Sequence, residues 1–322
     1  MRQGALRQSS STFLVVLLAF VFVRTTDLEA RVEAQSAIHD PQSATGASKQ
    51  SKQNTANTRV GIGSSFKGPL GLQLYSLRAD FAKDVPGALA KVREMGFREV
   101  EMGGTYGLTP QQFRAELDKA GLRAVSQGAS FDSLRDNIDT VISDAKAFGV
   151  QYVMCAWISH QRPFSEEAAR QAIQVFNRAG EKLKAAGITF AYHIHGYEFQ
   201  PYGEGTLFDL LATELKPEFV SFELDVFWAF HGGQDPVALM RKYPKRFTLM
   251  HLKDMRKGEK GNLTGNAPDD WSVALGAGQI DFPAVLREAK KAGVKWYFVE
   301  EESPTPLDNI PAGLRYLERL RF

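Results

Sequence analysis

Short apolar segments alternate with longer amphipathic segments along most of the chain. Eight of the apolar segments have the length and residue types of β-strands: residues 71–77, 98–104, 122–130, 150–158, 188–195, 219–228, 246–255 and 294–302. The segments between them have helical spacing, and two of these open with a capping residue followed by proline, Thr109-Pro110 and Asp235-Pro236. The pattern therefore predicts eight strand–helix units.

Strands that are separated by helices pair in parallel. Eight such units in about 250 residues match the size of a closed (β/α)₈ TIM barrel. We therefore predict one TIM-barrel catalytic domain over residues 67–322. An open, doubly wound sheet is the alternative, and the number of strands favours the barrel.

The first 34 residues differ from the rest of the chain. Two arginines precede the apolar run Phe13–Val23, which is shorter than the roughly 20 residues that cross a bilayer. Val32-Glu33-Ala34 follows as a small-residue cleavage site. We predict a signal peptide over residues 1–34, with an uncleaved signal anchor as the alternative.

Residues 35–66 are rich in Ser, Gln, Ala and Thr and carry few large apolar side chains. Such a segment cannot bury enough surface to offset its chain entropy, so we predict a disordered linker. We expect the mature chain to be exported, to a bacterial periplasm. The single cysteine, Cys155, excludes a disulfide within the chain.

Charge excludes one large class of partner. The chain has 39 basic and 37 acidic residues, a net charge of +2, and the two signs are mixed throughout. Nucleic-acid binding requires a concentrated basic surface, so we expect no nucleic-acid partner. The membrane is expected to contact only the signal segment, and the sequence allows an oligomer.

The segment TLMHLKDM, residues 248–255, carries the first indication of chemistry. Its alternation places Leu249, His251 and Lys253 on one face of a strand. Because unpaired polar groups are costly to bury, the imidazole and the ammonium need a partner, such as a metal or an anionic substrate.

Four consecutive predicted strands end in a carboxylate or an imidazole, namely Glu198, Asp225, His251 and Glu300. The C-terminal ends of barrel strands form the rim where TIM-barrel active sites lie. Three carboxylates and one imidazole suit Mn²⁺, Mg²⁺ or Co²⁺, and Zn²⁺ is an alternative. Taken singly, each glutamate could instead form a salt bridge, and the histidine could be a core residue.

Five segments together resemble the sugar phosphate isomerase/epimerase superfamily, the xylose isomerase-like TIM barrels. They are ITFAYHIHGYEF, FELDVFWAFHGGQDP, LMHLKDM, ALGAGQIDF and WYFVEEE, and the resemblance covers about residues 70–322. It implies a divalent metal held by Glu198, Asp225, His251 and Glu300. The first position could also be taken by His193 or His195, and the last by Glu301 or Glu302.

The resemblance also implies a reaction, the removal of a proton next to a sugar carbonyl through an enediolate. Glu198 and Glu300 would act as the acid and the base. Lys253 would stabilise negative charge or carry a proton, and its alternative role is an ion pair.

We expect the substrate, a small sugar or a keto-glycoside, to contact polar and aromatic side chains near the strand ends. These predicted substrate-binding residues are Gln73, Tyr75, Trp157, His193, His195 and Trp228.

Two positions depart from the pattern of the superfamily. Trp228 stands where ketose 3-epimerases carry a histidine, and Ser126-Gln127-Gly128 stands where relatives often have another. Together with export, these departures allow a second function, the cleavage of 3-keto-glycosides on the same barrel. A non-catalytic carbohydrate-binding barrel is the third alternative.

The signal-peptide prediction is tested by N-terminal sequencing of the exported chain. Cleavage after the small-residue site should leave Gln35 as the first residue. An exported chain that begins at Met1 would instead establish an uncleaved anchor.

Overall fold

The structure, a computed structural model, describes residues 60–322. The predicted signal peptide and the linker residues 35–59 lie outside the described residues. The last part of the predicted linker belongs to the folded domain, because Phe66 is buried with its ring 5.1 Å from that of Tyr297. The backbone N–H of Gly61 donates to Glu318 at 3.1 Å. A few apolar side chains, which the overall polarity of the segment conceals, are enough to dock it.

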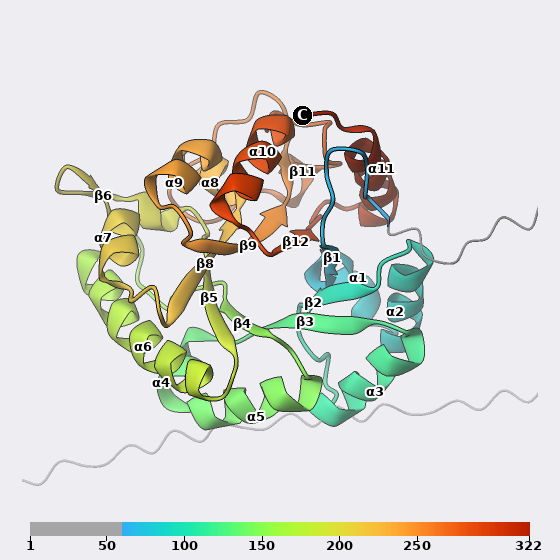
Figure 1. Cartoon of the computed structure of the whole chain (residues 1–322), viewed down its shortest axis with the longest axis horizontal. Helices are drawn as coiled ribbons and strands as arrows, with labels where there is room; N and C mark the ends of the chain where they lie inside the picture. The colour runs from blue at the N-terminus through green and yellow to red at the C-terminus, as the bar shows by residue number, and fades with distance from the viewer. Residues whose placement is uncertain (1–59) are drawn as a thin grey trace, which may run out of the picture. The chain divides into compact units, whose positions relative to one another are not determined.

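The prediction of a closed barrel is confirmed. Eight strands pair in parallel and close in the order β1-β12-β9-β8-β5-β4-β3-β2 (Figure 1). They are β1 (Leu70–Gln73), β2 (Glu99–Met102), β3 (Arg123–Gly128), β4 (Tyr152–Cys155), β5 (Thr189–His193), β8 (Val220–Asp225), β9 (Phe247–Leu252) and β12 (Trp296–Val299). The open-sheet alternative is therefore excluded.

Helices surround the barrel, as Figure 1 shows. They are α1 (Arg78–Phe81), α2 (Val85–Glu94), α3 (Pro110–Ala120), α4 (Phe131–Asp136), α5 (Ile138–Phe148), α6 (Glu166–Ala185), α7 (Leu207–Glu214), α8 (Val226–His231), α9 (Pro236–Lys242), α10 (Phe282–Ala292) and α11 (Pro306–Arg319). Thr109 caps α3 as predicted, in a reciprocal capping box with Gln112. Within residues 60–322 no helix has both the length and the apolar character needed to cross a membrane.

Several shorter elements lie in the connections between the barrel strands and the helices. Two small antiparallel pairs join β6 (Pro201–Tyr202) to β7 (Gly205–Thr206) and β10 (Asp254–Met255) to β11 (Ser272–Val273). The 3₁₀ turns are η1 (Leu74–Leu77), η2 (Tyr197–Phe199) and η3 (Asp269–Trp271).

The interior of the barrel has an apolar layer and, nearer the C-terminal ends of the strands, a polar layer. Five buried side chains form one apolar cluster, Val125, Met154, Ala191, Leu249 and Phe298. The next inward-facing residue on several of these strands, toward the C-terminal end, is polar. His193 follows Ala191 on β5, and His251 follows Leu249 on β9. Strand alternation thus places a polar layer directly on an apolar floor.

Two strands of the barrel contain a shift of register. One lies between Val100 and Glu101, where β2 pairs with β3, and the other lies between Phe222 and Glu223, where β8 pairs with β9. The extra residue of the two shifts is Val125 on β3 and Thr248 on β9, respectively. Both shifts immediately precede a fully buried glutamate.

Asp254, in β10, stabilises the connection that follows β9 through hydrogen bonds to its backbone. Its buried carboxylate accepts hydrogen bonds from the backbone N–H groups of Gly276, Gly278 and Ile280, at 2.9, 2.9 and 3.2 Å. It also accepts from Met255 at 2.9 Å. A Cβ at Gly278 would lie 2.2 Å from this carboxylate, so the close approach requires glycine.

We predict that Asp254→Ala destabilises the chain, because it leaves four backbone donors without their acceptor. The loss should be about 1–3 kcal/mol for the buried unsatisfied groups. Thermal unfolding measures it, with Asp270→Ala as the control, since Asp270 is exposed in the same connection. Equal melting temperatures for the two variants would show that the hydrogen bonds to Asp254 do not stabilise the chain.

Candidate metal centre

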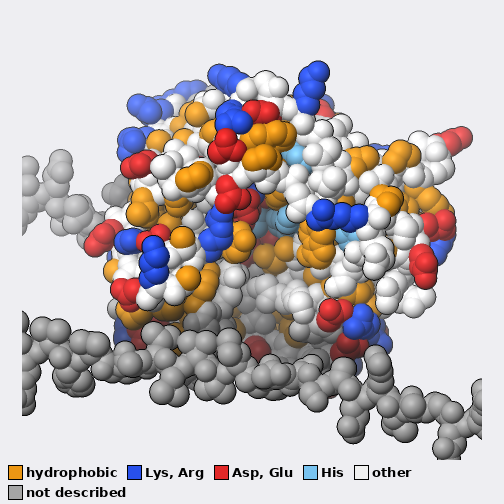
Figure 2. All heavy atoms as spheres, turned by 180° about the vertical axis from the view of Figure 1, so that it is seen from behind, with side chains coloured by type: hydrophobic (Ala, Val, Ile, Leu, Met, Phe, Trp, Pro, Cys, Tyr) orange, Lys and Arg blue, Asp and Glu red, His pale blue; other side chains and the backbone are white. Residues whose placement is uncertain are grey.

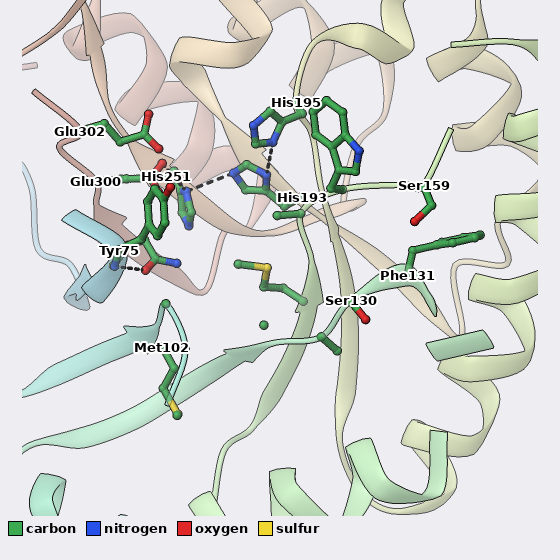
Figure 3. A pocket seen from close by; sticks show the side chains of 18 residues that line it. Tyr75, Met102, Ser130, Phe131, Ser159, His193, His195, His251, Glu300 and Glu302 are labelled. Atoms are coloured by element: carbon green, nitrogen blue, oxygen red, sulfur yellow. Dashed lines mark hydrogen bonds and ion pairs between the residues drawn. The ribbon is translucent and has the colours of Figure 1, made fainter. Parts of the chain in front are cut away.

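A cleft of about 500 Å³ opens at the C-terminal ends of the barrel strands. Figure 2 shows it as a hollow with histidine side chains inside. Its two ends differ in chemistry. The side chains of His193, His195, His251, Glu300 and Glu302 line one end, and the ends of β2, β3 and β4 line the other with small and apolar residues (Figure 3).

Four buried side chains converge at the polar end, one from each of β5, β8, β9 and the residue after β12. They are His193, Asp225, His251 and Glu300, whose nearest ligand atoms all lie within 4.8 Å of one another. Nε2 of His193 lies 3.1 Å from Nδ1 of His251. The same Nδ1 lies 3.3 Å from Oε2 of Glu300 and 3.5 Å from Oδ2 of Asp225.

These spacings fit a single divalent ion. Donors that bind one ion at about 2.1 Å lie about 3.0 Å apart in an octahedron and about 3.4 Å apart in a tetrahedron. Oδ2 of Asp225 is buried and has no hydrogen-bond partner among the described residues, which leaves its lone pairs directed at the centre of the cluster. Two imidazoles and two carboxylates therefore form a donor set that can hold a transition metal or zinc.

The structure brings three of the four predicted ligands together and places a different residue at the fourth position. Asp225, His251 and Glu300 meet as expected, but β5 contributes His193 in place of Glu198. Oε1 of Glu198 accepts from the hydroxyl of Tyr192 and, at 3.0 Å, from the backbone N–H of His195. Tyr192 precedes His193 on β5 and packs against Phe176 of α6, outside the barrel. Glu198 therefore faces the helix layer and is absent from the cleft.

Glu302 and Lys253 adjoin the cluster. Nζ of Lys253 lies 2.5 Å from Oε2 of Glu302 and 3.4 Å from Oε2 of Glu300. The ammonium also lies over the rings of Phe227 and Trp228, at 4.9 and 5.0 Å. Lys253 is fully buried, so the ion pair predicted as its alternative role is present.

The remaining predicted substrate-binding residues divide into two groups. Gln73, Tyr75, Trp157 and His195 line the cleft. Trp228 does not line it, because its ring is buried behind His195 and stacks on that imidazole at 4.5 Å. Trp228 therefore supports His195 from behind. Of the alternatives at the last ligand position, Glu301 binds the backbone N–H of Ser303 and is absent from the lining.

Burial and charge act in opposite directions in this cluster. Burial alone would raise the pKa of Asp225, but the nearby imidazoles of His193 and His251, each 3.5 Å from Oδ2, and the charge of Lys253 hold it well below its usual range. For Glu300, Lys253 and His251 likewise outweigh burial and lower the pKa to about 2. Both carboxylates are therefore charged and available as ligands at neutral pH.

The surroundings of His195 favour its neutral form, in contrast to the charged forms of Asp225 and Glu300. Burial, together with the neighbouring His193 and Lys253, lowers the pKa of His195 well below its usual value. Its Nδ1 lies 3.3 Å from Nδ1 of His193. His195 is therefore a neutral imidazole at the cleft wall, in contact with a ligand of the cluster.

A profile of the xylose isomerase-like TIM-barrel family matches residues 89–320. The chain belongs to this family. It is 25% identical over 281 residues to inosose dehydratase from Geobacillus kaustophilus, which covers 74% of this chain and 90% of that protein.

Solved structures agree with this family membership. A sugar phosphate isomerase/epimerase from Parabacteroides distasonis is 27% identical, with a TM-score of 0.64 over 80% of this chain and 96% of that one. The IolI protein with a bound zinc atom shares the fold at 15% identity, with a TM-score of 0.58 over 78% and 95% of the two chains.

Three acidic residues that adjoin the candidate ligands in the structure were not predicted in these positions from the sequence. Glu302 was considered only as a substitute ligand, and Glu101 and Glu223 were not considered. The alternation of REVEMGG and FELDVFW could have indicated inward glutamates. However, alternation within one strand does not show which inward residues of distant strands meet at His251.

His193 and Glu198 are the two candidate metal ligands from the β5 region. They lead to different predictions about which variant loses the metal. His193→Ala should weaken the binding of Mn²⁺ or Co²⁺ by more than about 100-fold, the upper range for changes to groups behind a ligand. Glu198→Gln should leave metal affinity unchanged, because Glu198 faces the helix layer. Metal titration of both variants measures this, and the reverse result would restore Glu198 as the ligand.

Proposed function

We propose that this protein is a metal-dependent enzyme that removes a proton next to the carbonyl group of a polyhydroxylated ketone, a sugar or a cyclitol. The observation that carries the proposal is the convergence of His193, Asp225, His251 and Glu300 at the polar end of an open cleft. The inosose dehydratases and the sugar phosphate isomerase/epimerase among its relatives support this class of chemistry.

Buried charge supports a bound dication. Glu101, Glu223, Asp225 and Glu300 are buried at this end of the barrel, whereas Lys253 is the one buried ammonium in contact with them among the described residues. Unbalanced buried charge is strongly unfavourable. A divalent cation between these groups removes most of the imbalance.

The donor set narrows the choice of metal. Two imidazole nitrogens and two carboxylate oxygens favour Mn²⁺, Co²⁺ or Zn²⁺ over Mg²⁺, which prefers oxygen ligands alone. When bound, such an ion polarises a carbonyl group and stabilises the enediolate that forms beside it.

Two groups line the cleft beside the cluster and can move protons. His195 and Glu302 lie at opposite ends of the row of labelled side chains that includes His251 and His193 (Figure 3). We assign the removal of the α-proton to one and its return to the other, in place of Glu198 and Glu300. Lys253 holds Glu302 in position and contributes positive charge near the enediolate oxygen.

The enediolate has more than one outcome. Return of the proton to another face or carbon makes the enzyme an epimerase or isomerase, whereas loss of a β-hydroxyl makes it a dehydratase. All of these outcomes share the proton abstraction that the cleft supports.

The second candidate function is the cleavage of a 3-keto-glycoside, with loss of the glycosidic alcohol as leaving group. The apolar end of the cleft favours it, because Met102, Ala129 and Met154 lie where an aglycone would extend from the metal. The export predicted from residues 1–34 is part of this proposal.

The cleft also restricts the charge of the substrate. Among the described residues that line it, none is Lys or Arg. Phosphate esters are usually bound by such cations or by helix N-termini. The N-terminus of the six-residue α4 borders the cleft at its apolar end, where Ser130 caps it by accepting from the backbone N–H of Ser133. We therefore propose a substrate without a phosphate group.

We predict that the metal-loaded enzyme converts neutral keto-polyols and 3-keto-glycosides in preference to their phosphate esters. His195→Gln and Glu302→Gln should each lower kcat by about 10²–10⁴-fold, the range for general acid–base groups, while metal content stays at the wild-type level. Ser159→Ala, at the apolar end of the cleft, is the matched control.

Product analysis after a metal-supplemented screen makes this measurement. Full activity after exhaustive chelation would refute metal dependence. A chain that binds metal and sugar but converts no substrate would support the non-catalytic carbohydrate-binding barrel.

A further inference from the structure

The imidazole of His251 has two polar edges, and both are occupied by acidic groups. Nδ1 faces the cluster of candidate ligands. Nε2, on the opposite edge, lies 2.6 Å from Oε1 of Glu101 and 3.3 Å from Oε1 of Glu223. His251, Glu101 and Glu223 are all buried, so solvent does not screen these contacts.

The backbone supports this arrangement from two sides of the barrel. Glu101 on β2 and Glu223 on β8 each lie beside a shift of strand register whose extra residue is on the neighbouring strand, Val125 on β3 and Thr248 on β9. Glu223 lies two residues before Asp225 on the same strand, so ordinary strand alternation places both on the inward face. Two strands from different parts of the barrel thus bring two carboxylates to a single nitrogen atom.

The two glutamates make few compensating contacts. Among the described residues, Oε2 of Glu101 and both carboxylate oxygens of Glu223 have no hydrogen-bond partner. No Lys or Arg side chain of residues 60–322 forms a salt bridge with either residue, and their ionic contacts all go to His251. Such burial is costly unless positive charge lies nearby. The imidazole, with a dication on its other edge, supplies that charge.

We propose that Glu101 and Glu223 are positioning residues, which hold His251 through Nε2 and so keep Nδ1 directed at a divalent cation. This inference rests on the proposed function, since it requires that the cluster binds a metal. Glu101 accepts a hydrogen bond from the Nε2–H group and so fixes the tautomer, and Glu223 adds a second carboxylate behind the ring. Both effects increase the donor strength of Nδ1.

A third residue fixes Glu101 in turn. Nε2 of Gln73 donates to Oε1 of Glu101 at 3.0 Å. The amide oxygen of Gln73 accepts from the backbone N–H of Tyr75 at 2.7 Å, which sets the orientation of the amide. Glu101 is therefore aligned by two donors, and it connects His251 to the segment that carries Tyr75 at the cleft.

A positioning role and a purely structural role predict opposite effects on the metal-free protein. If Glu101 and Glu223 only stabilised the barrel, their replacement would lower the melting temperature of the metal-free chain. If they act on the metal through His251, replacing either carboxylate by the isosteric amide removes uncompensated buried charge. The metal-free chain then becomes as stable as the wild type or more stable, while metal affinity falls.

The experiment uses the full chain with Glu101→Gln, Glu223→Gln and, as the matched control, Glu288→Gln. Glu288 is a largely buried glutamate of α10 that pairs with Arg241, away from the cleft. Mn²⁺ and Co²⁺ affinities are measured by competition with a chelator, and the visible spectrum of the Co²⁺ form reports ligand geometry. Thermal unfolding is followed without metal.

We expect Glu101→Gln and Glu223→Gln to weaken metal binding by about 10- to 100-fold and to alter the Co²⁺ spectrum. Their metal-free melting temperatures should equal or exceed the wild-type value. Glu288→Gln should keep the wild-type affinity. Glu101→Asp keeps the charge on a shorter side chain and should recover part of the metal affinity. This variant also tests the proposal if one of the amide variants does not fold.

Three results would overturn parts of this account separately. Wild-type metal affinity in both amide variants refutes the positioning role alone. A fall in metal-free stability in parallel with affinity also refutes it, because it assigns the glutamates to the fold. A wild-type chain that binds none of Mn²⁺, Co²⁺ and Zn²⁺ refutes the proposed function at the first titration.

Discussion

A concentration of buried carboxylates dominates the centre of this barrel. Four of them, on Glu101, Glu223, Asp225 and Glu300, surround one imidazole, and Lys253 is the buried ammonium beside them. Burying several acidic groups together is unfavourable unless positive charge lies among them. A divalent cation between Nδ1 of His251 and the carboxylates of Asp225 and Glu300 is the simplest physical resolution.

The barrel makes this concentration of charge feasible. Its apolar floor closes the interior below the polar layer, and the cleft opens only at the C-terminal ends of the strands. Parallel strands place residues from distant parts of the sequence at the same height, so ligands from β5, β8, β9 and β12 meet without any adjustment of the loops.

Much of this could be predicted from the sequence, because it depends on periodicity. Eight apolar segments at regular spacing define the barrel, and strand ends locate Asp225, His251 and Glu300. The structure does not bring Glu198 to the cleft lining, because Glu198 follows a turn. Gly196, with φ of 89°, begins that turn, and the 3₁₀ segment Tyr197–Phe199 then directs Glu198 outward. A hydrophobic pattern gives alternation within a strand but no direction after it ends.

The central claim is that His193, Asp225, His251 and Glu300 bind one divalent ion. The most direct measurement is a crystal structure of the chain grown with Co²⁺ or Mn²⁺, with diffraction data collected at the absorption edge of the metal. The account predicts a single anomalous peak about 2.0–2.3 Å from Nε2 of His193, Nδ1 of His251 and the carboxylate oxygens of Asp225 and Glu300. A peak coordinated by Glu198, or no peak at this cluster, would contradict it.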